Sequence, residues 1–227
     1  MNHKYLIFDS GSLINFSANS LLSVFEDLKK IFPGEFLITK TVKYEVIDHP
    51  IKVKRFEWGA LRVQELLNKG VIKIAENNVV NENELKKEAG KILDIANNTF
   101  FVKNRALHLI DKGEAEALAL SRILTRNKNQ NTVVIDERTA RVLYEKPEYL
   151  QRLMSKKLHK NVSAKKENFK EFSGINIIRS TELAYIAYKK GFIHIKDKKT
   201  LEAVTYALKF NGVSISEKEV QMYKRFG

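Results

Sequence analysis

Short apolar runs alternate with amphipathic stretches along this chain of 227 residues. Runs this short and this apolar are typical of strands that are buried on both faces. They predict strands at residues 5–8, 36–38, 71–74, 133–135 and 175–178. Apolar positions at helical spacing predict helices over residues 13–31, 54–69, 82–97, 101–110, 111–126, 181–190 and 198–210. Strands that alternate with helices predict an α/β fold, a three-layer α/β/α sandwich around a short parallel sheet.

A change in composition predicts how the chain is divided. Residues 152–170 hold seven Lys or Arg and one acid, with few large apolar side chains. Clusters of basic residues of this kind either bind a phosphate backbone or are simply solvated. We therefore expect a core domain at residues 1–144, a basic and mobile insertion at 145–172, and a helical C-terminal extension at 173–227. The extension also holds the last predicted strand and either completes or packs on the same domain.

Composition excludes several classes of protein. The chain has no cysteine, which excludes disulfides and thiolate zinc sites. Nothing approaches the 18 apolar residues expected of a membrane span, and the N-terminal apolar run breaks at Asp9, unlike a signal peptide. We expect a cytoplasmic protein. The net charge of +13 favours a polyanionic partner such as nucleic acid, although many lysines can also be solvent-exposed without binding a partner.

Acidic residues stand where predicted strands end or helices begin. Asp9 directly follows the first strand, and Asp136 follows the strand at 133–135. Ligand chemistry in open α/β sheets sits at the carboxyl ends of the strands. Glu45 and either Glu114 or Glu116 add acids at helical positions. Mg²⁺ prefers such oxygen ligands, and crowded carboxylates tolerate one another when a cation compensates their charge. The pattern indicates a cation site.

Four segments carry a resemblance to a known family. They read Phe-Asp-Ser-Gly-Ser-Leu-Ile at 8–14, Val-Lys-Tyr-Glu-Val at 42–46, Asp-Lys-Gly-Glu-Ala-Glu-Ala-Leu-Ala-Leu-Ser at 111–121 and Val-Ile-Asp-Glu-Arg-Thr-Ala-Arg at 134–141. In this order they resemble the four motifs of PIN-domain nucleases, in the prokaryotic branch whose third motif is Gly-Glu-Ala-Glu-Ala. Residues 182–193 and 211–216 are similar to the later helix and closing turn of that branch.

The resemblance implies a PIN-like fold and a metal-dependent ribonuclease that hydrolyses RNA phosphodiester bonds. It implies Asp9, Glu45, Glu114 and Asp136 as catalytic residues and as ligands of Mg²⁺ or Mn²⁺. Asp9 could instead simply cap the next helix, which is a common role for Asp.

The third acidic position has two candidates. Glu114 and Glu116 are two residues apart on a helix and cannot face the same way. Glu114 also fits the third position of a capping box opened by Asp111. Its spacing to the following Ala and Ser residues matches the family better, so we prefer Glu114 and keep Glu116 as the alternative metal ligand.

Basic and hydroxyl residues near these acids supply candidates for substrate contact. Arg138 and Arg141 either hold substrate phosphate or pair with Glu137 and Glu145. Ser10 and Ser12 either orient Asp9 or cap a helix. The lysines of the basic segment that we expect to contact substrate phosphate are Lys156, Lys157 and Lys160.

Other conspicuous side chains receive structural interpretations. We expect Trp58, Phe100 and Phe101 to pack in the core from helices rather than stack on bases. His108 lies in an apolar helical pattern and is expected to be structural. The five His residues show no ligand spacing, which argues against zinc.

Alternatives to the ribonuclease differ in biology or in class. The chain could be the toxin of a toxin–antitoxin pair, with an antitoxin or a processing factor as partner, although its length argues mildly against a simple toxin. It could be a PIN-like nucleic-acid-binding module without catalysis. DNA could replace RNA as substrate, and PIN proteins often form homodimers. The sequence does not name an interface.

Overall fold

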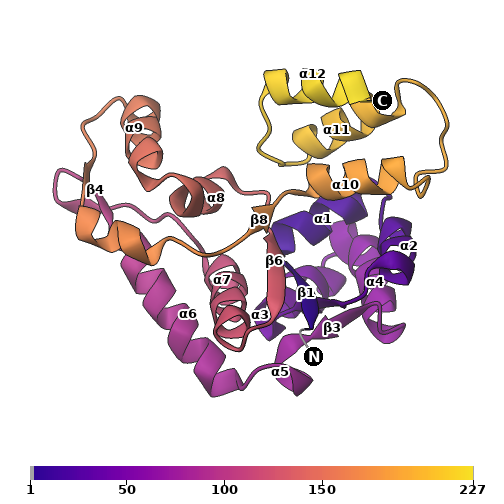
Figure 1. Cartoon of the computed structure of the whole chain (residues 1–227), viewed down its shortest axis with the longest axis horizontal. Coiled ribbons are helices and arrows are strands. Elements are labelled where there is room, and N and C mark those ends of the chain that lie inside the picture. The colour runs from indigo at the N-terminus through magenta and orange to yellow at the C-terminus, as the bar shows by residue number, and fades with distance from the viewer. Residues whose placement is uncertain (1–2, 227) are drawn as a thin grey trace.

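The computed structural model describes residues 3–226, in which helices and strands alternate (Figure 1). The strands are β1 (Lys4–Phe8), β2 (Glu35–Ile38), β3 (Ile72–Ile74), β4 (Phe100–Val102), β5 (Arg105–Ala106), β6 (Gln130–Val134), β7 (Ser163–Ala164) and β8 (Ile177–Ile178). The α-helices are α1 (Ser10–Ala18), α2 (Ser23–Ile31), α3 (Lys40–Lys43), α4 (Lys54–Asn68), α5 (Ala75–Asn78), α6 (Glu82–Asn97), α7 (Lys112–Arg126), α8 (Arg138–Glu145), α9 (Pro147–Leu158), α10 (Ser180–Lys189), α11 (Thr200–Phe210) and α12 (Glu217–Phe226). A π-helical turn η1 (Tyr44–Asp48) and the 3₁₀ turns η2 (Pro50–Lys52) and η3 (Lys166–Glu171) complete the set.

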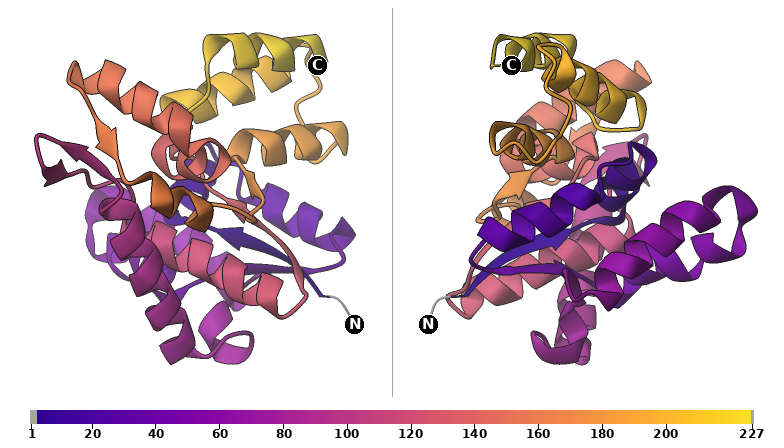
Figure 2. Two further views of the ribbon diagram at one scale, coloured as in Figure 1. Left: turned by 60° about the vertical axis from the view of Figure 1, so that its left-hand side comes forward. Right: turned by 90° about the vertical axis from the view of Figure 1, so that its right-hand side faces the viewer.

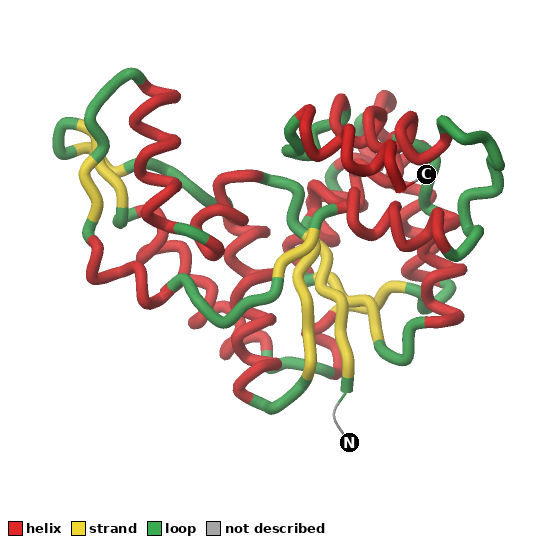
Figure 3. Tube along the Cα trace, turned by 45° about the horizontal axis from the view of Figure 1, so that its top comes forward, coloured by secondary structure: helices red, strands yellow, loops and turns green. Residues whose placement is uncertain are grey.

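Five strands form one parallel sheet in the order β3-β2-β1-β6-β8 (Figure 3). In the register of the central pair, Phe8 lies opposite Val134. β8 pairs with β6, so the segment after residue 173 contributes a strand to the same sheet. From β1 the chain builds the sheet outward on one side through β2 and β3, and then returns to the other side of β1 with β6 and β8. The strand order therefore reverses at β1.

The sheet is covered by helices on both faces. Ile7, Leu37 and Val133 contribute to one buried cluster, which also takes side chains from α6, α7, α8 and α9. Phe8 and Phe36 contribute to a second cluster with α1, α2, α4 and α10. Successive strand residues point to opposite faces, which is why the continuous apolar runs serve both clusters. The α/β fold is confirmed, and its parallel sheet is compatible with a three-layer sandwich.

The prediction of a helix at residues 101–110 is wrong. Residues 100–106 form the antiparallel hairpin of β4 and β5, residues 107–110 have no regular structure, and β7 pairs with the other edge of β4. Lys103 and Asn104 connect the hairpin with φ of 48° and 64°. A two-residue turn with positive φ at both positions matches the twist of a hairpin.

The helix expected over residues 13–31 is divided. α1 ends at Ala18 and α2 begins at Ser23, with Ser20 between them at φ 58°. Ser20 therefore leaves the right-handed helical region, and the two helices pack as separate elements.

The basic segment has regular structure. Residues 152–170 span the end of α9, β7 and most of η3. The N–H of Lys165 donates to the carbonyl of Thr99 at 2.9 Å, and the guanidinium of Arg122 donates to the carbonyl of Glu171. The segment is thus tied to the β4 hairpin and to α7 (Figure 2).

The C-terminal helices α10, α11 and α12 lie together at one end of the molecule (Figures 1 and 2). The capping box expected at the start of the last helix is present, because Ser216 and Glu219 exchange hydrogen bonds. None of the helices within residues 3–226 has the length and apolar character needed to cross a membrane.

Candidate functional site

Asp9 and Asp136 lie at the same edge of the sheet, after the neighbouring strands β1 and β6. The N–H of Asp9 donates to the carbonyl of Val134 at 3.1 Å, which fixes the end of β1 beside β6. The strand order changes direction at this point. Ligand sites in open α/β sheets form in the crevice at such a switch point.

Asp9 is buried and combines two roles. As the N-cap of α1 it accepts a hydrogen bond from the N–H of Gly11 at 3.3 Å through Oδ2. Its Oδ1 is buried without a hydrogen-bond partner. Burial raises the pKa of Asp9 to about 7, the N–H groups of Ser10 and Gly11 oppose the shift, and the charges of Glu45 and Asp136 add to it. The capping role therefore leaves one oxygen of a buried carboxylate without a hydrogen-bond donor.

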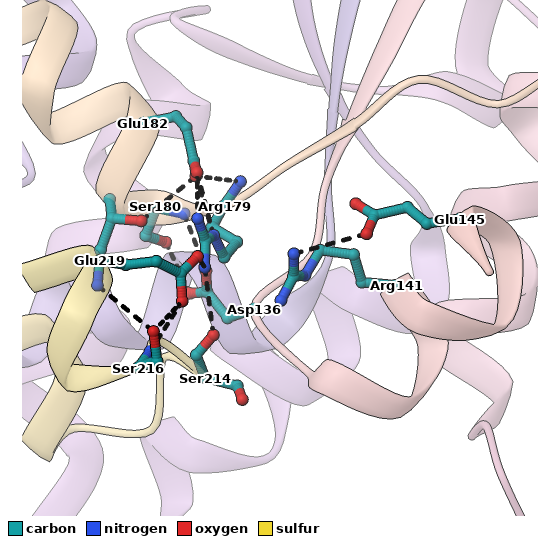
Figure 4. Close-up of polar contacts among 10 residues, drawn as sticks. Asp136, Arg141, Glu145, Arg179, Ser180, Glu182, Ser214, Ser216 and Glu219 are labelled. Carbon is teal, nitrogen blue, oxygen red and sulfur yellow. Dashed lines mark hydrogen bonds and ion pairs between the residues drawn. The ribbon is translucent and has the colours of Figure 1, made fainter. Parts of the chain in front are cut away.

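Asp136 accepts three hydrogen bonds, two of them from Ser180, which lies beside it in Figure 4. Its Oδ1 accepts from the N–H of Ser180 at 2.8 Å, and its Oδ2 accepts from the Ser180 hydroxyl at 2.6 Å. Asn15 donates to Oδ2 at 2.7 Å. Burial raises the pKa of Asp136, and these donors oppose the shift. A carboxylate has about four acceptor positions, so roughly one is left for a further ligand.

Ser180 and Asn15 were not anticipated from the sequence. The signal for Asn15 was a polar residue between Leu13 and Phe16 on the apolar side of a helix, where all three side chains are buried. Ser180 follows β8 and begins α10, and no local pattern links it to Asp136, which is 44 positions away.

An ion-pair network supports the start of α10 (Figure 4). The buried guanidinium of Arg179 pairs with Glu182 at 2.5 Å and with Glu219 of α12 at 2.8 Å. Burial by itself would lower the pKa of Arg179, but its bonds to both glutamates raise it. The network joins α12 to the residue that precedes Ser180.

Glu114 faces Asp9 from the first turn of α7. Its Oε2 accepts from the N–H of Asp111 at 2.9 Å, and the capping box expected from the sequence is present. Burial raises the pKa of Glu114 to about 8, and the charge of Asp9 is the next contribution. The two carboxylates therefore lie near each other and compete for a compensating charge.

Glu116 faces a different neighbour. It accepts from the Thr41 hydroxyl at 2.7 Å, lies 3.9 Å from the ammonium of Lys112, and has Oε2 buried without a partner. Its charge contributes to the raised pKa of Glu45. Glu114 thus lies on the Asp9 side of α7 and Glu116 on the Glu45 side.

Glu45 lies on the π-helical turn η1 and is half-buried. Single π-turns are frequent at functional sites. Burial raises the pKa of Glu45, the Ser10 hydroxyl opposes the shift with a hydrogen bond, and Asp111 and Glu116 add to it. A Cβ at Gly113 would lie 2.8 Å from Oε2 of Glu45, so the glycine lets this carboxylate approach the backbone of α7.

One further acid of this edge was missed by sequence reasoning. Glu76 is the second residue of α5, two positions after β3 ends; it accepts from the N–H of Lys40 at 2.8 Å and has Oε2 buried without a partner. Burial raises its pKa, and the charge of Glu116 adds to the shift. The signal was available, since Glu76 also follows a predicted strand.

The donor set fits a hard divalent cation in its chemistry. Within residues 3–226, five buried side-chain polar atoms have no hydrogen-bond partner, and three of them are carboxylate oxygens of Asp9, Glu76 and Glu116. Buried charges need pairing or a metal. In the present side-chain arrangement, however, no three acidic or histidine side chains of the described residues are grouped closely enough to hold an ion. The carboxylates would have to rotate toward a cation to form its shell.

The basic candidates have different surroundings. Arg138 is exposed at the first position of α8, and no carboxylate of the described residues pairs with it. Arg141 lies 3.6 Å from Glu145, one of the two roles considered for it. Glu137 is exposed and caps α8 through Ala140.

The three lysines expected to contact substrate phosphate are exposed at the C-terminal end of α9 and beyond it. Figure 1 shows that α9 leads away from α8 and the end of β6. The structure does not bring Lys156, Lys157 and Lys160 together with the acids.

Three structural interpretations from the sequence need correction. Trp58 is 72% exposed on α4 and does not pack in the core. Phe100 is buried as expected, but it and Phe101 lie on a strand rather than a helix. His108 is exposed in the segment before α7 and contacts Asp111 at 2.7 Å.

Comparisons with known protein families, with curated proteins and with solved structures found no match for this chain.

Proposed function

We propose that this protein is a divalent-metal-dependent nuclease with a PIN-like fold that hydrolyses RNA phosphodiester bonds. The observation that carries the proposal is Asp9 at the switch point of the sheet. It is buried, one of its oxygens lacks a partner, and the charges of Glu45, Glu114 and Asp136 all act on it. The order of motifs along the sequence adds independent support.

In this proposal Asp9 and Glu114 hold the cation, with Glu45 and the remaining acceptor position of Asp136 completing the set. Glu116 is the alternative on the Glu45 side. Mg²⁺ or Mn²⁺ would supply charge stabilisation at the phosphate and a more acidic bound water. The chain's own donors, from Ser180, Asn15 and Ser10, orient the carboxylates before substrate arrives.

Arg138 is the strongest candidate on this chain for holding the substrate phosphate. It begins α8 two residues after Asp136 and has no carboxylate partner among the described residues. Its guanidinium is therefore free for a bidentate bond to phosphate oxygens. Arg141 would first have to leave Glu145.

The test is cleavage of labelled RNA and DNA, single-stranded and structured, with Mg²⁺, Mn²⁺ or EDTA. We expect RNA cleavage that EDTA abolishes and that Asp9→Asn and Asp136→Asn reduce by at least about 100-fold. Asp94→Asn on the exposed face of α6 is the matched control, because its contact with Asn98 is remote from the acids. Undiminished cleavage by both site variants would overturn the proposal.

Two outcomes would redirect the assignment. Cleavage of DNA but not RNA would keep the mechanism and change the substrate. Tight RNA binding without calorimetric binding of Mg²⁺ or Mn²⁺ would instead identify a binding module.

A further inference from the structure

A cavity of about 630 Å³ lies beside Glu45, between α1, η1 and α4. Its lining includes Ile14 of α1, His49 and Trp58. Cavities of this size accommodate a small organic ligand such as a nucleoside. Glu45 is the candidate metal ligand that lines it, so the cavity adjoins the acidic site at Glu45.

The rim of this cavity exposes large apolar side chains. Trp58 is 72% exposed, Phe56 51% and Ile14 49%. Tyr44, on the same π-turn as Glu45, is 54% exposed and its ring lies 6.0 Å from that of His49. Exposed aromatic side chains that gather at one cavity mark a binding surface rather than scattered surface residues.

The same rim carries positive charge. Arg55 lies over the ring of Phe56 at 5.5 Å, and no carboxylate of residues 3–226 pairs with it. Arg62, one turn after Trp58, is half-buried and donates to the carbonyl of Ser17 at 3.4 Å. Arg55, Trp58 and Arg62 are spaced three and four residues apart and so lie on one side of α4.

We propose that this cavity is a nucleobase subsite, in which Trp58 stacks on an unpaired base while Arg55 and Arg62 contact the flanking phosphates. The inference rests on the proposed function and narrows its substrate to single-stranded RNA. Aromatic platforms beside cationic groups bind single strands in this manner. A base within a duplex has both faces covered by its neighbours and is not available for stacking on Trp58.

α1 and α4 are in close contact where they line the cavity. The Ser17 hydroxyl donates to the carbonyl of Gly59 at 3.3 Å, and a Cβ on Gly59 would lie 3.0 Å from that hydroxyl. The contact between Ser17 and Gly59 therefore holds α1 and α4 together within the lining of the cavity, where Trp58 is exposed. Figure 2 (right) shows α4 at the edge of the molecule.

A protein partner is the competing occupant, because apolar rims also bind helices. The unpaired Arg55 and the net charge of +13 favour an anionic ligand, and Glu45 in the lining places that ligand beside the proposed cation site. A second copy of this chain would bring the same positive charge against the rim.

Trp58 is the single tryptophan of the chain, so its fluorescence reports on this subsite alone. The probe is a single-stranded RNA decamer, titrated in EDTA so that it is not cleaved, with the same decamer in a duplex as comparison. We expect the single strand to quench the Trp58 emission and the duplex to leave it largely unchanged.

Variants then measure the energetic role of each group with a fluorescein-labelled decamer. Trp58→Ala should weaken binding about 5- to 150-fold, as is typical of one lost stacking contact, while Trp58→Phe retains most of it. Arg55→Gln should weaken binding and reduce its salt dependence. Phe210→Ala, on an 80% exposed aromatic of α11, and Lys87→Gln, on α6, are the matched controls and should bind as wild type.

The outcomes separate this inference from the nuclease proposal. Quenching and a loss of affinity in Trp58→Ala without any metal-dependent cleavage would support the subsite and overturn the nuclease. Cleavage lost in Asp9→Asn but wild-type RNA affinity in Trp58→Ala would support the nuclease and overturn the subsite. Unchanged RNA affinity together with a change from dimer to monomer in Trp58→Glu would assign the surface to a second copy.

Discussion

Ser180 binds the carboxylate of Asp136 through two donors, its N–H at 2.8 Å and its hydroxyl at 2.6 Å. The pair joins the start of α10 to the residue that follows β6, so the C-terminal helices contribute directly to the candidate site. The proposed function therefore predicts that changes in the segment after β8 alter activity as well as packing.

Removing the Ser180 hydroxyl should therefore affect both stability and activity. Ser180→Ala retains the N–H bond but leaves Oδ2 of Asp136 with Asn15 alone. We expect the free energy of unfolding to fall by about 1–2 kcal/mol, and cleavage to fall because Asp136 is less well oriented. Urea unfolding and the RNA cleavage assay check this. Ser173→Ala, at an exposed serine that contacts the carbonyl of Lys170, is the control and should change neither.

Gly113 offers a way to move Glu45 without removing its charge. In Gly113→Ala the new methyl group would meet Oε2 of Glu45 at 2.8 Å, so the carboxylate must shift. We expect cleavage to fall severalfold while stability is retained, since alanine favours a helix over glycine by roughly 1 kcal/mol. Gly90→Ala on α6 has open space around the added Cβ and should gain stability with full activity. Full activity in Gly113→Ala would argue against a role for Glu45 at its present position.

The acidic site should make the metal-free protein sensitive to rising pH. The pKa of Asp9 is raised from 3.8 to about 7 and that of Glu114 from 4.5 to about 8. The folded state therefore binds more protons than the unfolded state between these values, and its stability is present at low pH and lost as pH rises. In EDTA we expect stability from this source to fall between about pH 4 and pH 8.

Two additions test that pH dependence. Mg²⁺ or Mn²⁺ at pH 8 should restore stability, because a cation that binds the folded state offsets the repulsion. Asp9→Asn should flatten the profile, measured by urea unfolding at each pH. If the free energy of unfolding of Asp9→Asn fell with pH as steeply as that of wild type, other groups would dominate the pH dependence of stability.

The stability contributed by the ion pairs of Arg179 should depend on pH in the opposite direction. Although burial raises the pKa of Glu219, bonds from Ser216 and Arg179 lower it to about 2, and Arg179 likewise lowers the pKa of Glu182. These contributions are present above the unfolded value of 4.5 and are lost as pH falls toward 2. Arg179→Met should cost roughly 2–3 kcal/mol at pH 7, with the difference from wild type shrinking in acid. Arg152→Met, at an exposed arginine of α9, is the matched control.

Features that depend on local pattern could be predicted from the sequence. The strands that end before Asp9 and Asp136 were predictable because apolar runs buried on both faces are conspicuous. The helices at α6 and α7 and the capping boxes at Asp111 and Ser216 follow from local spacing and local hydrogen bonds.

Tertiary structure decided what depends on distant partners. Residues 101–110 form a hairpin because β4 pairs with β7, some 60 positions later, and helical spacing cannot reveal that pairing. The exposure of Trp58 depends on which face of α4 the rest of the chain covers. Ser180 reaches Asp136 because β8 joins β6 in the sheet. Glu114 and Glu116 were both visible as acids, but only the packing of α7 against β1 and α3 directs one toward Asp9 and the other toward Thr41.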